Sequence, residues 1–157
     1  MTTPAPADGS TTTVRQAVEA DLLAIQRIER ESFPQPWPYE AFRRFLGGDG
    51  FLVCEDSGAV AGYVVADSMP NYGRPLGHVK DIAVHPEYRG RGLGRLLLQR
   101  ALGVLEAEGA RTVKLEVREG NDPALALYRE FDFEHRRTVP RYYADGEDAL
   151  VMVRESD

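Results

Sequence analysis

Residues 79–108 read VKDIAVHPEYRGRGLGRLLLQRALGVLEAE, and this stretch decides the fold. The apolar run at 82–84 predicts a strand, which His85 and Pro86 end with a turn. From Leu93 onward, leucine, alanine and valine recur at helical spacing with charged residues between them. A cluster of glycine and arginine at 89–95 therefore falls where a strand passes into an amphipathic helix.

Such a junction suits an anion, because free backbone N–H groups and the positive end of the helix dipole meet there. The glycines allow close backbone approach and the arginines add charge, which predicts a pyrophosphate-binding turn. The dinucleotide pattern G-x-G-x-x-G fails because position 95 is arginine, and the P-loop pattern fails because no Gly-Lys-Ser/Thr follows. The remaining alternative is a solvated basic turn without a ligand.

Length and composition predict an ordinary globular protein of 157 residues. Residues 1–12 contain little to bury and are expected to be disordered, which leaves 13–157 as a single domain. The net charge of -6 argues against nucleic-acid binding. The single Cys54 favours a reducing compartment, and we see neither a signal peptide nor an apolar run of about 18 residues. A cytoplasmic protein that makes no membrane contact is expected.

The periodicities predict an α/β fold with element order β-α-α-β-β-β-α-β-α-β-β. Expected strands cover 13–17, 51–55, 60–65, 82–84, 112–117, a segment from 133 onward, and 149–153. Expected helices begin at 19, cover 39–46 and about 93–108, and follow a cap at 121–123. A long loop is expected at 68–77. Helices are expected to flank a mixed, mainly antiparallel sheet in a three-layer α-β-α arrangement.

The pattern R-x-x-G-x-G at 89–94, preceded by I-A-V-H-P, resembles the acetyl-CoA signature of the GNAT acetyltransferase superfamily. L-E-V-R at 115–118, A-L-Y at 126–128, R-Y-Y at 141–143 and F-P-Q-P-W at 33–37 resemble the RimI-type protein N-alpha-acetyltransferases and their archaeal relatives. The likeness covers about 14–154. It implies a GNAT fold that moves an acetyl group from acetyl-CoA directly to a protein N-terminus in a ternary complex. A ribosomal protein is one candidate acceptor.

The resemblance also assigns roles to individual residues. It implies that backbone groups of Ile82, Ala83 and Val84 pair with the pantetheine arm, and that Asn121 holds this arm from the other side. The pyrophosphate would be wrapped by Arg89, Gly90, Arg91, Gly92, Leu93, Gly94 and Arg95. Glu116 matches the general base of the family and Tyr128 its general acid. No metal is expected, because the three histidines lack ligand spacing.

The chemistry fits these residue types. An α-amine with a pKa of about 7.7–8.0 must lose a proton before it attacks a thioester. Glu116 could take that proton, directly or through water, if its surroundings raise its pKa. Tyr128, with an ordinary pKa of about 10, could protonate the leaving thiolate. The alternatives are a solvated glutamate on a strand and a tyrosine that only packs in the core.

Three aromatic residues are candidates for acceptor binding. Tyr142 and Tyr143 could form a wall of a peptide slot or be ordinary strand aromatics, and Trp37 could be a substrate lid or a packing plug. Some archaeal relatives carry a catalytic glutamate where this chain has Gln35, which cannot act as a base. A small-molecule amine or a lysine side chain is an alternative acceptor. The remaining alternative is a CoA-binding module without turnover, against which the pair Glu116 and Tyr128 argues.

One departure from the family concerns a helix end. The fourth helix ends in Phe-Asp-Phe at 131–133, where the family commonly has a glycine before the last phenylalanine. The helix is expected to terminate on Asp132, because aspartate tolerates the left-handed conformation better than most residues.

Overall fold

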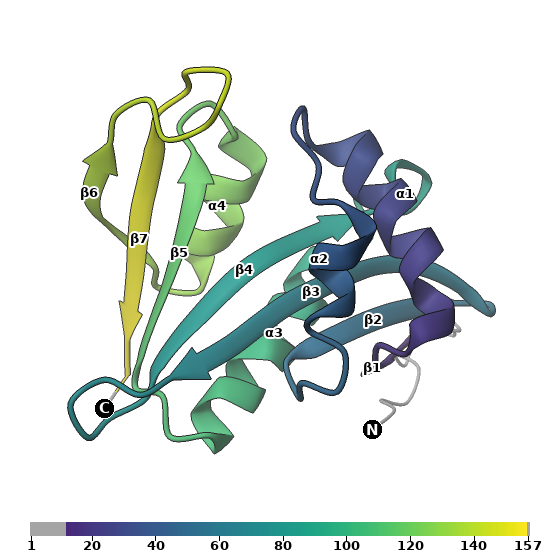
Figure 1. Cartoon of the computed structure of the whole chain (residues 1–157), viewed down its shortest axis with the longest axis horizontal. Helices are drawn as coiled ribbons and strands as arrows, with labels where there is room; N and C mark the ends of the chain where they lie inside the picture. Colours follow the sequence, from purple (N-terminus) through teal and green to yellow (C-terminus); the bar gives the residue numbers. More distant parts are fainter. Residues whose placement is uncertain (1–11, 157) are drawn as a thin grey trace.

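A computed structural model describes residues 12–156. Its centre is a seven-stranded sheet in the order β1-β2-β3-β4-β5-β7-β6 (Figure 1). The strands are β1 (Thr12–Gln16), β2 (Phe51–Asp56), β3 (Ala59–Met69), β4 (Leu76–Val84), β5 (Thr112–Arg118), β6 (Glu134–Val139) and β7 (Ala149–Glu155). The helices are α1 (Leu22–Ser32), α2 (Tyr39–Arg43), α3 (Leu93–Ala107) and α4 (Asp122–Glu130). The predicted element order is confirmed.

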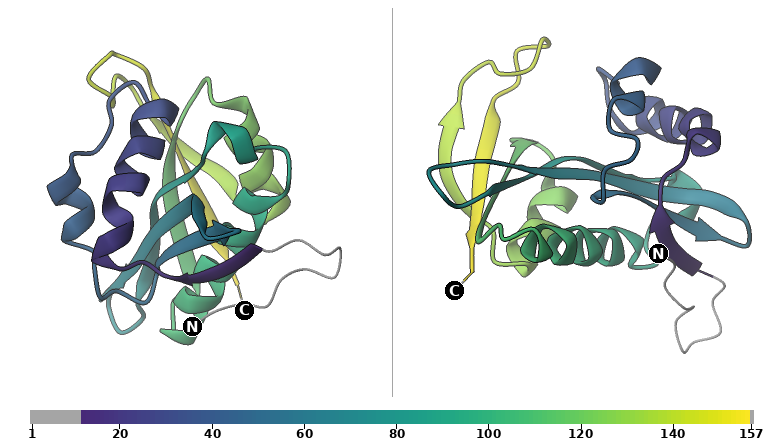
Figure 2. Two further views of the ribbon diagram at one scale, coloured as in Figure 1. Left: turned by 90° about the vertical axis from the view of Figure 1, so that its right-hand side faces the viewer. Right: turned by 60° about the horizontal axis from the view of Figure 1, so that its bottom comes forward.

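The helices cover both faces of the sheet. Helices α1 and α2 lie on one face and α3 and α4 on the other (Figure 2). The α1/α2 face buries an aromatic core around Phe42, Phe51 and Tyr63. The α3/α4 face buries an aliphatic core that includes Leu97 and Leu105. Every neighbouring pair of strands is antiparallel except β4 and β5, so the predicted mixed, mainly antiparallel three-layer fold is also confirmed.

Helix α3 forms as its periodicity predicts. Leu97, Leu98, Ala101 and Leu105 are completely buried against the sheet. Helix α3 lies very close to the sheet at Gly62, where an added Cβ would lie 2.9 Å from the Ala83 carbonyl oxygen and 3.1 Å from a Leu97 methyl. A side chain there would therefore push helix and sheet apart, at a cost typical of overpacked cores, about 1–3 kcal/mol.

Several predicted boundaries were wrong by a few residues. The long loop at 68–77 shrinks to 70–75, because β3 and β4 continue to pair as far as Met69 opposite Leu76. Helix α2 ends at Arg43 rather than 46, since Phe45 and Leu46 bond to carbonyls three residues earlier and so tighten the last turn. The helix expected from 19 begins with a short 3₁₀ turn, η1 (Glu19–Asp21).

The predicted ends of two further segments can also be compared with the structure. Asp132 has a φ of 67°, so α4 terminates on this aspartate in the left-handed conformation, as predicted. Thr12, placed in the disordered tail by the sequence, is the first residue of β1. The remainder of that predicted tail, 1–11, lies outside the described residues.

Strands β4 and β5 diverge, and this divergence positions the site (Figure 1). Their parallel ladder joins Leu76–His78 to Thr112–Lys114, and beyond it the strands line opposite walls of one cavity. A β-bulge contributes to the curvature of β4: Val65 pairs with Asp81 and Ala66 with Val79, so Lys80 is the additional residue.

Candidate active site

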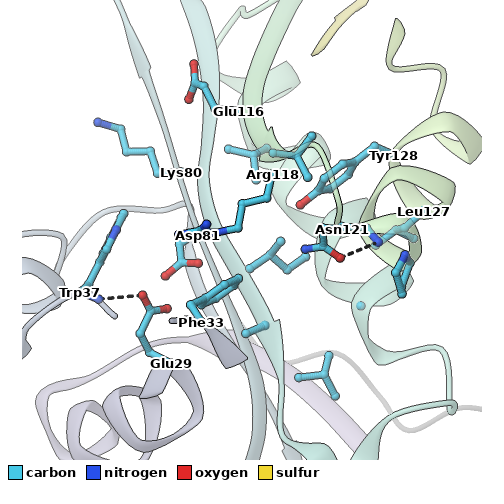
Figure 3. Close-up of a pocket in the computed structure, with 18 of the residues that line it drawn as sticks. Glu29, Phe33, Trp37, Lys80, Asp81, Glu116, Arg118, Asn121, Leu127 and Tyr128 are labelled. Atoms are coloured by element: carbon cyan, nitrogen blue, oxygen red, sulfur yellow. Dashed lines mark hydrogen bonds between the residues drawn. The ribbon is translucent and has the colours of Figure 1, made fainter. Parts of the chain in front are cut away.

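The cavity between β4 and β5 has a volume of about 520 Å³, within the range typical of small-molecule sites. Side chains from both strands, from α4 and from the segment after α1 meet there (Figure 3). It brings together most of the predicted residues: Trp37, Ile82, Ala83, Val84, Arg89, Gly94, Glu116, Asn121, Tyr128, Tyr142 and Tyr143. The other predicted residues, Gly90, Arg91, Gly92, Leu93 and Arg95, belong to the adjoining turn and the start of α3.

The adjoining turn has the backbone of an anion-binding site. Gly90 and Gly92 have φ angles of 79° and 80°, which glycine adopts without steric cost. Helix α3 begins at Leu93, whose side chain is buried in the core, so only its backbone faces outward from the helix start. The first N–H groups of α3 have no carbonyl partner within the helix and remain available to a ligand.

The arginines of this turn already have partners within the protein. Arg89 donates from Nε to the Val84 carbonyl oxygen at 3.0 Å and from Nη2 to Ser32 Oγ at 3.2 Å. The other two form ion pairs, Arg91 with Asp56 at 3.5 Å and Arg95 with Glu130 at 2.5 Å. Backbone N–H groups are therefore the preformed part of this candidate anion site, and Arg91 and Arg95 are exposed guanidinium groups beside it.

Asn121 caps α4 at the edge of the cavity. Its Oδ1 accepts a hydrogen bond from the Ala124 N–H at 3.3 Å, and Pro123 occupies the first turn, as the sequence predicts. Because the oxygen is used for the cap, the amide nitrogen is free to face the cavity (Figure 3). Asn121 can thus serve helix and ligand together.

Glu116 forms a close pair with a residue that the sequence did not single out. Its Oε1 lies 2.7 Å from His78 Nε2, and its Oε2 lies 3.5 Å from Lys114 Nζ. The hydrogen bond to His78, followed by the electrostatic interactions with His78 and Lys114, lowers the pKa of Glu116, although partial burial opposes this. The structure does not meet the condition of a raised Glu116 pKa that was attached to its role as a base.

His78 reaches Glu116 because the parallel ladder pairs His78 with Lys114, two residues before Glu116. Both side chains of the pair are about five-sixths buried, with 16% and 17% exposed. The structure therefore pairs the predicted base with a second ionisable side chain.

Tyr128 faces the same cavity from α4, and its hydroxyl points toward the centre (Figure 3). The residue is only 6% exposed, and its ring packs edge-on against Phe133 at 5.9 Å. Burial, and then the electrostatic interactions with Asp81 and Tyr143, raise its pKa, so the hydroxyl stays protonated. Tyr128 is thus a core residue whose protonated hydroxyl faces the cavity.

The predicted acceptor-binding aromatics lie at the mouth. The Trp37 ring stacks on Phe45 at 5.8 Å and still lines the cavity, so packing and substrate contact are compatible. Tyr142 and Tyr143 meet edge to face at 5.0 Å. Burial raises the pKa of Tyr143 to about 12. All three aromatic residues line the cavity.

A second buried cluster was missed by the sequence reasoning. Tyr63 donates to Glu29 Oε1 at 2.5 Å and lies 3.3 Å from Asp81 Oδ2, while the other oxygen of Glu29 accepts from the Trp37 N–H at 2.8 Å. Burial and the neighbouring Glu29 raise the pKa of Asp81 well above its usual range. The three residues come from α1, β3 and β4, and only tertiary structure unites them.

Comparison with known proteins identifies the family. Residues 22–133 match the Acetyltransferase (GNAT) family. The chain belongs to this family of N-acetyltransferases. An N-alpha-acetyltransferase of Sulfolobus acidocaldarius is 37% identical over 151 residues, which cover 88% of this chain and 89% of the relative. A putative ribosomal protein bS18 alanine N-acetyltransferase of Bacillus subtilis is 35% identical over 147 residues, covering 88% and 92%.

The fold comparison agrees. The crystal structure of Ard1 from Thermoplasma volcanium matches with a TM-score of 0.85 and 26% identity, covering 93% of this chain and 98% of that one. Among residues 12–156 no group of three histidine, cysteine or acidic side chains could hold a metal ion. None of the helices in this range is long and apolar enough to cross a membrane.

Proposed function

We propose that this GNAT enzyme transfers the acetyl group of acetyl-CoA to the α-amine of a protein N-terminus. The observation that supports this best is the cavity between β4 and β5, which is lined by Glu116 from β5 and by Tyr128 from α4, with His78 bonded to Glu116. A proton acceptor and a proton donor in one cavity are what acyl transfer to an amine requires.

Acetyl-CoA fits the residues that line the cavity. Its pantetheine arm would pair with the backbone of Ile82, Ala83 and Val84, with the Asn121 amide on its other side. Its pyrophosphate would sit on the N–H groups of the turn at 89–95 and the start of α3. Arg91 and Arg95, more than half exposed, would add charge without a large desolvation cost. No metal enters this proposal.

The reaction would proceed by direct transfer. The neutral amine attacks the thioester carbonyl, a C–N bond forms, and the C–S bond breaks. The amine proton passes to the Glu116–His78 pair, directly or through water, and Tyr128 protonates the leaving thiolate. Backbone N–H groups at the end of β4 would polarise the carbonyl, and much of the rate would come from positioning.

An α-amine suits this proton acceptor better than a lysine side chain does. The ordinary pKa of lysine is about 10.4 and that of an α-amine about 7.7–8.0, so deprotonating lysine costs about 3.5 kcal/mol more. Glu116 has a lowered pKa and is a mild base, which favours the more acidic ammonium group. The relatives from Sulfolobus acidocaldarius and Bacillus subtilis are named as an N-alpha-acetyltransferase and as a putative ribosomal protein alanine N-acetyltransferase. A ribosomal protein is therefore one candidate acceptor. A small-molecule amine is the second candidate, because the mouth of the cavity is open to solvent.

The acceptor can be tested with peptides that differ only in their first residue, each carrying an internal lysine. After incubation with acetyl-CoA, fragmentation by mass spectrometry locates the acetyl group. Acetylation at the N-terminus and none on a matched peptide with a blocked N-terminus is expected. Acetylation restricted to lysine would refute the α-amine proposal. The free, buried Cys54 agrees with a cytoplasmic protein, and removing it should not affect the assay.

A further inference from the structure

Arg118 occupies the mouth of the cavity but has no part in the proposed reaction. It follows Glu116 by two residues on β5, so both side chains leave the same face of the strand. Its side chain is only 12% exposed. It lies between two segments that flank the opening: residues 33–38 after α1 and residues 140–148 between β6 and β7. We refer to these as the first and second acceptor loops.

Three contacts attach Arg118 to the second acceptor loop. Nη1 donates to Asp145 Oδ2 at 2.8 Å and to Glu147 Oε1 at 2.9 Å. The guanidinium plane lies 4.0 Å from the centre of the Tyr143 ring. The other oxygen of Glu147 accepts from the Gly120 N–H at 2.9 Å, which connects the loop to the start of α4. Because Arg118 forms ion pairs with two carboxylates, its guanidinium group is not free to bind an anion.

The same side chain also contacts the first acceptor loop. Nη2 donates to Gln35 Oε1 at 3.2 Å. Gln35 stands between Pro34 and Pro36, whose rings fix the backbone and limit the positions that the Gln35 amide can reach. Arg118 therefore connects two loops more than 100 residues apart in the chain, through a planar group whose donors have fixed directions.

We propose that Arg118 is a positioning residue, which holds the two acceptor loops at the separation where a peptide N-terminus fits between them. The second loop presents Tyr142 and Tyr143 and the first presents Trp37, so their spacing determines the width of the opening. The identity of the acceptor rests on the function proposed above. The coupling of the loops does not, and it can be measured without any acceptor.

The first experiment uses the protein without substrates. Trp37 is the only tryptophan, so acrylamide quenching of intrinsic fluorescence reports on the first loop alone. Hydrogen exchange with mass spectrometry reports on 140–148. Arg118→Met keeps the aliphatic part of the side chain and removes the guanidinium group. We expect more efficient quenching of Trp37 and about tenfold faster exchange in the second loop, typical of a segment released from its contacts. Unchanged values at both loops would overturn the proposal.

Two controls separate positioning from general damage. Gln35→Ala cuts only the contact to the first loop, so it should raise quenching and leave exchange at 140–148 as in the wild type. Arg129→Met removes an exposed arginine from α4 and should change neither. If Arg129→Met produced the same effects as Arg118→Met, the loop changes would be unspecific and the inference would fail.

The second experiment measures steady-state kinetics. For Arg118→Met, we expect the KM for the peptide to rise about tenfold, a loss typical of a misplaced acceptor, with kcat within about threefold and an unchanged KM for acetyl-CoA. The pH profile of kcat/KM should not shift, because the partners of Glu116 are His78 and Lys114. A shifted profile, or a fall in kcat alone, would mean that Arg118 acts on the reacting groups. If the wild type acetylates no peptide, the proposed function fails, and the quenching and exchange results still decide this inference.

Discussion

Replacing Glu116 with glutamine tests the proposed proton acceptor most directly. The substitution keeps the size of the side chain and removes its negative charge, so the 2.7 Å contact with His78 loses its ionic character. General-base catalysis contributes about 10²–10⁴-fold, and a hundredfold loss in kcat corresponds to about 2.7 kcal/mol in the barrier. We expect a loss of at least about a hundredfold, with acetyl-CoA binding retained.

The pH dependence gives an independent check. Glu116 has a lowered pKa in the folded state, so its stabilising effect is present above the ordinary glutamate pKa of about 4.3 and is lost as pH falls through the folded value. For a partly buried pair we expect about 1 kcal/mol, or roughly 2–4 °C in Tm at pH 7. This difference between wild type and variant should disappear in acid.

The assay combines initial rates at saturating acetyl-CoA, calorimetric titration with CoA, and thermal unfolding across pH. His78→Gln is the matched variant, because it removes the other half of the pair and should also lower kcat. If Glu116→Gln retains the full rate, Glu116 takes no proton in the rate-limiting step. If the variant loses CoA binding as well, the loss of rate would reflect a damaged cofactor site and the reasoning would be refuted.

Three further predictions concern other residues. Tyr128→Phe should lower kcat about a hundredfold while calorimetry shows intact CoA binding; an unchanged rate would exclude it as the acid. Asp81 has a raised pKa, so its stabilising effect is present below about pH 3.9 and lost as pH rises; Asp81→Asn should therefore raise Tm by a few degrees at pH 7 and not at pH 4. Gly92→Ala, at φ 80°, should weaken CoA binding about tenfold by titration, against an unchanged Gly103→Ala control.

The elements that the sequence predicted well are those with strong local signals. Helix α3 has an unbroken apolar stripe and glycines at both ends, and the hairpin between β2 and β3 has its turn residues at Ser57 and Gly58. The outer ends of β3 and β4 were missed, because Asp67, Ser68 and Met69 are not typical strand residues. Pairing with the opposite strand overrides their weak propensity.

The residues of the site also fall into those that local sequence patterns predicted and those that they missed. The turn at 89–95 and the cap at Asn121 each lie within a short stretch of sequence, so local patterns were enough to predict both. The partner of Glu116 was missed, because His78 lies 38 residues away and meets it only through the parallel register of β4 and β5. Lone histidines are uninformative in a sequence, and the predicted strand at 82–84 did not extend back to His78, so no local signal pointed to it.

The divergence of β4 from β5 has a consequence for the life of the protein in the cell. Beyond the short ladder that joins β4 to β5, the sheet is open between its first four strands and its last three. In the proposed complex, pantetheine bridges that gap. A ligand present at about a hundred times its Kd would add about 2.7 kcal/mol to folding stability. Resistance to proteases would then follow the supply of acetyl-CoA, so that a starved cell would lose this enzyme faster than a fed one.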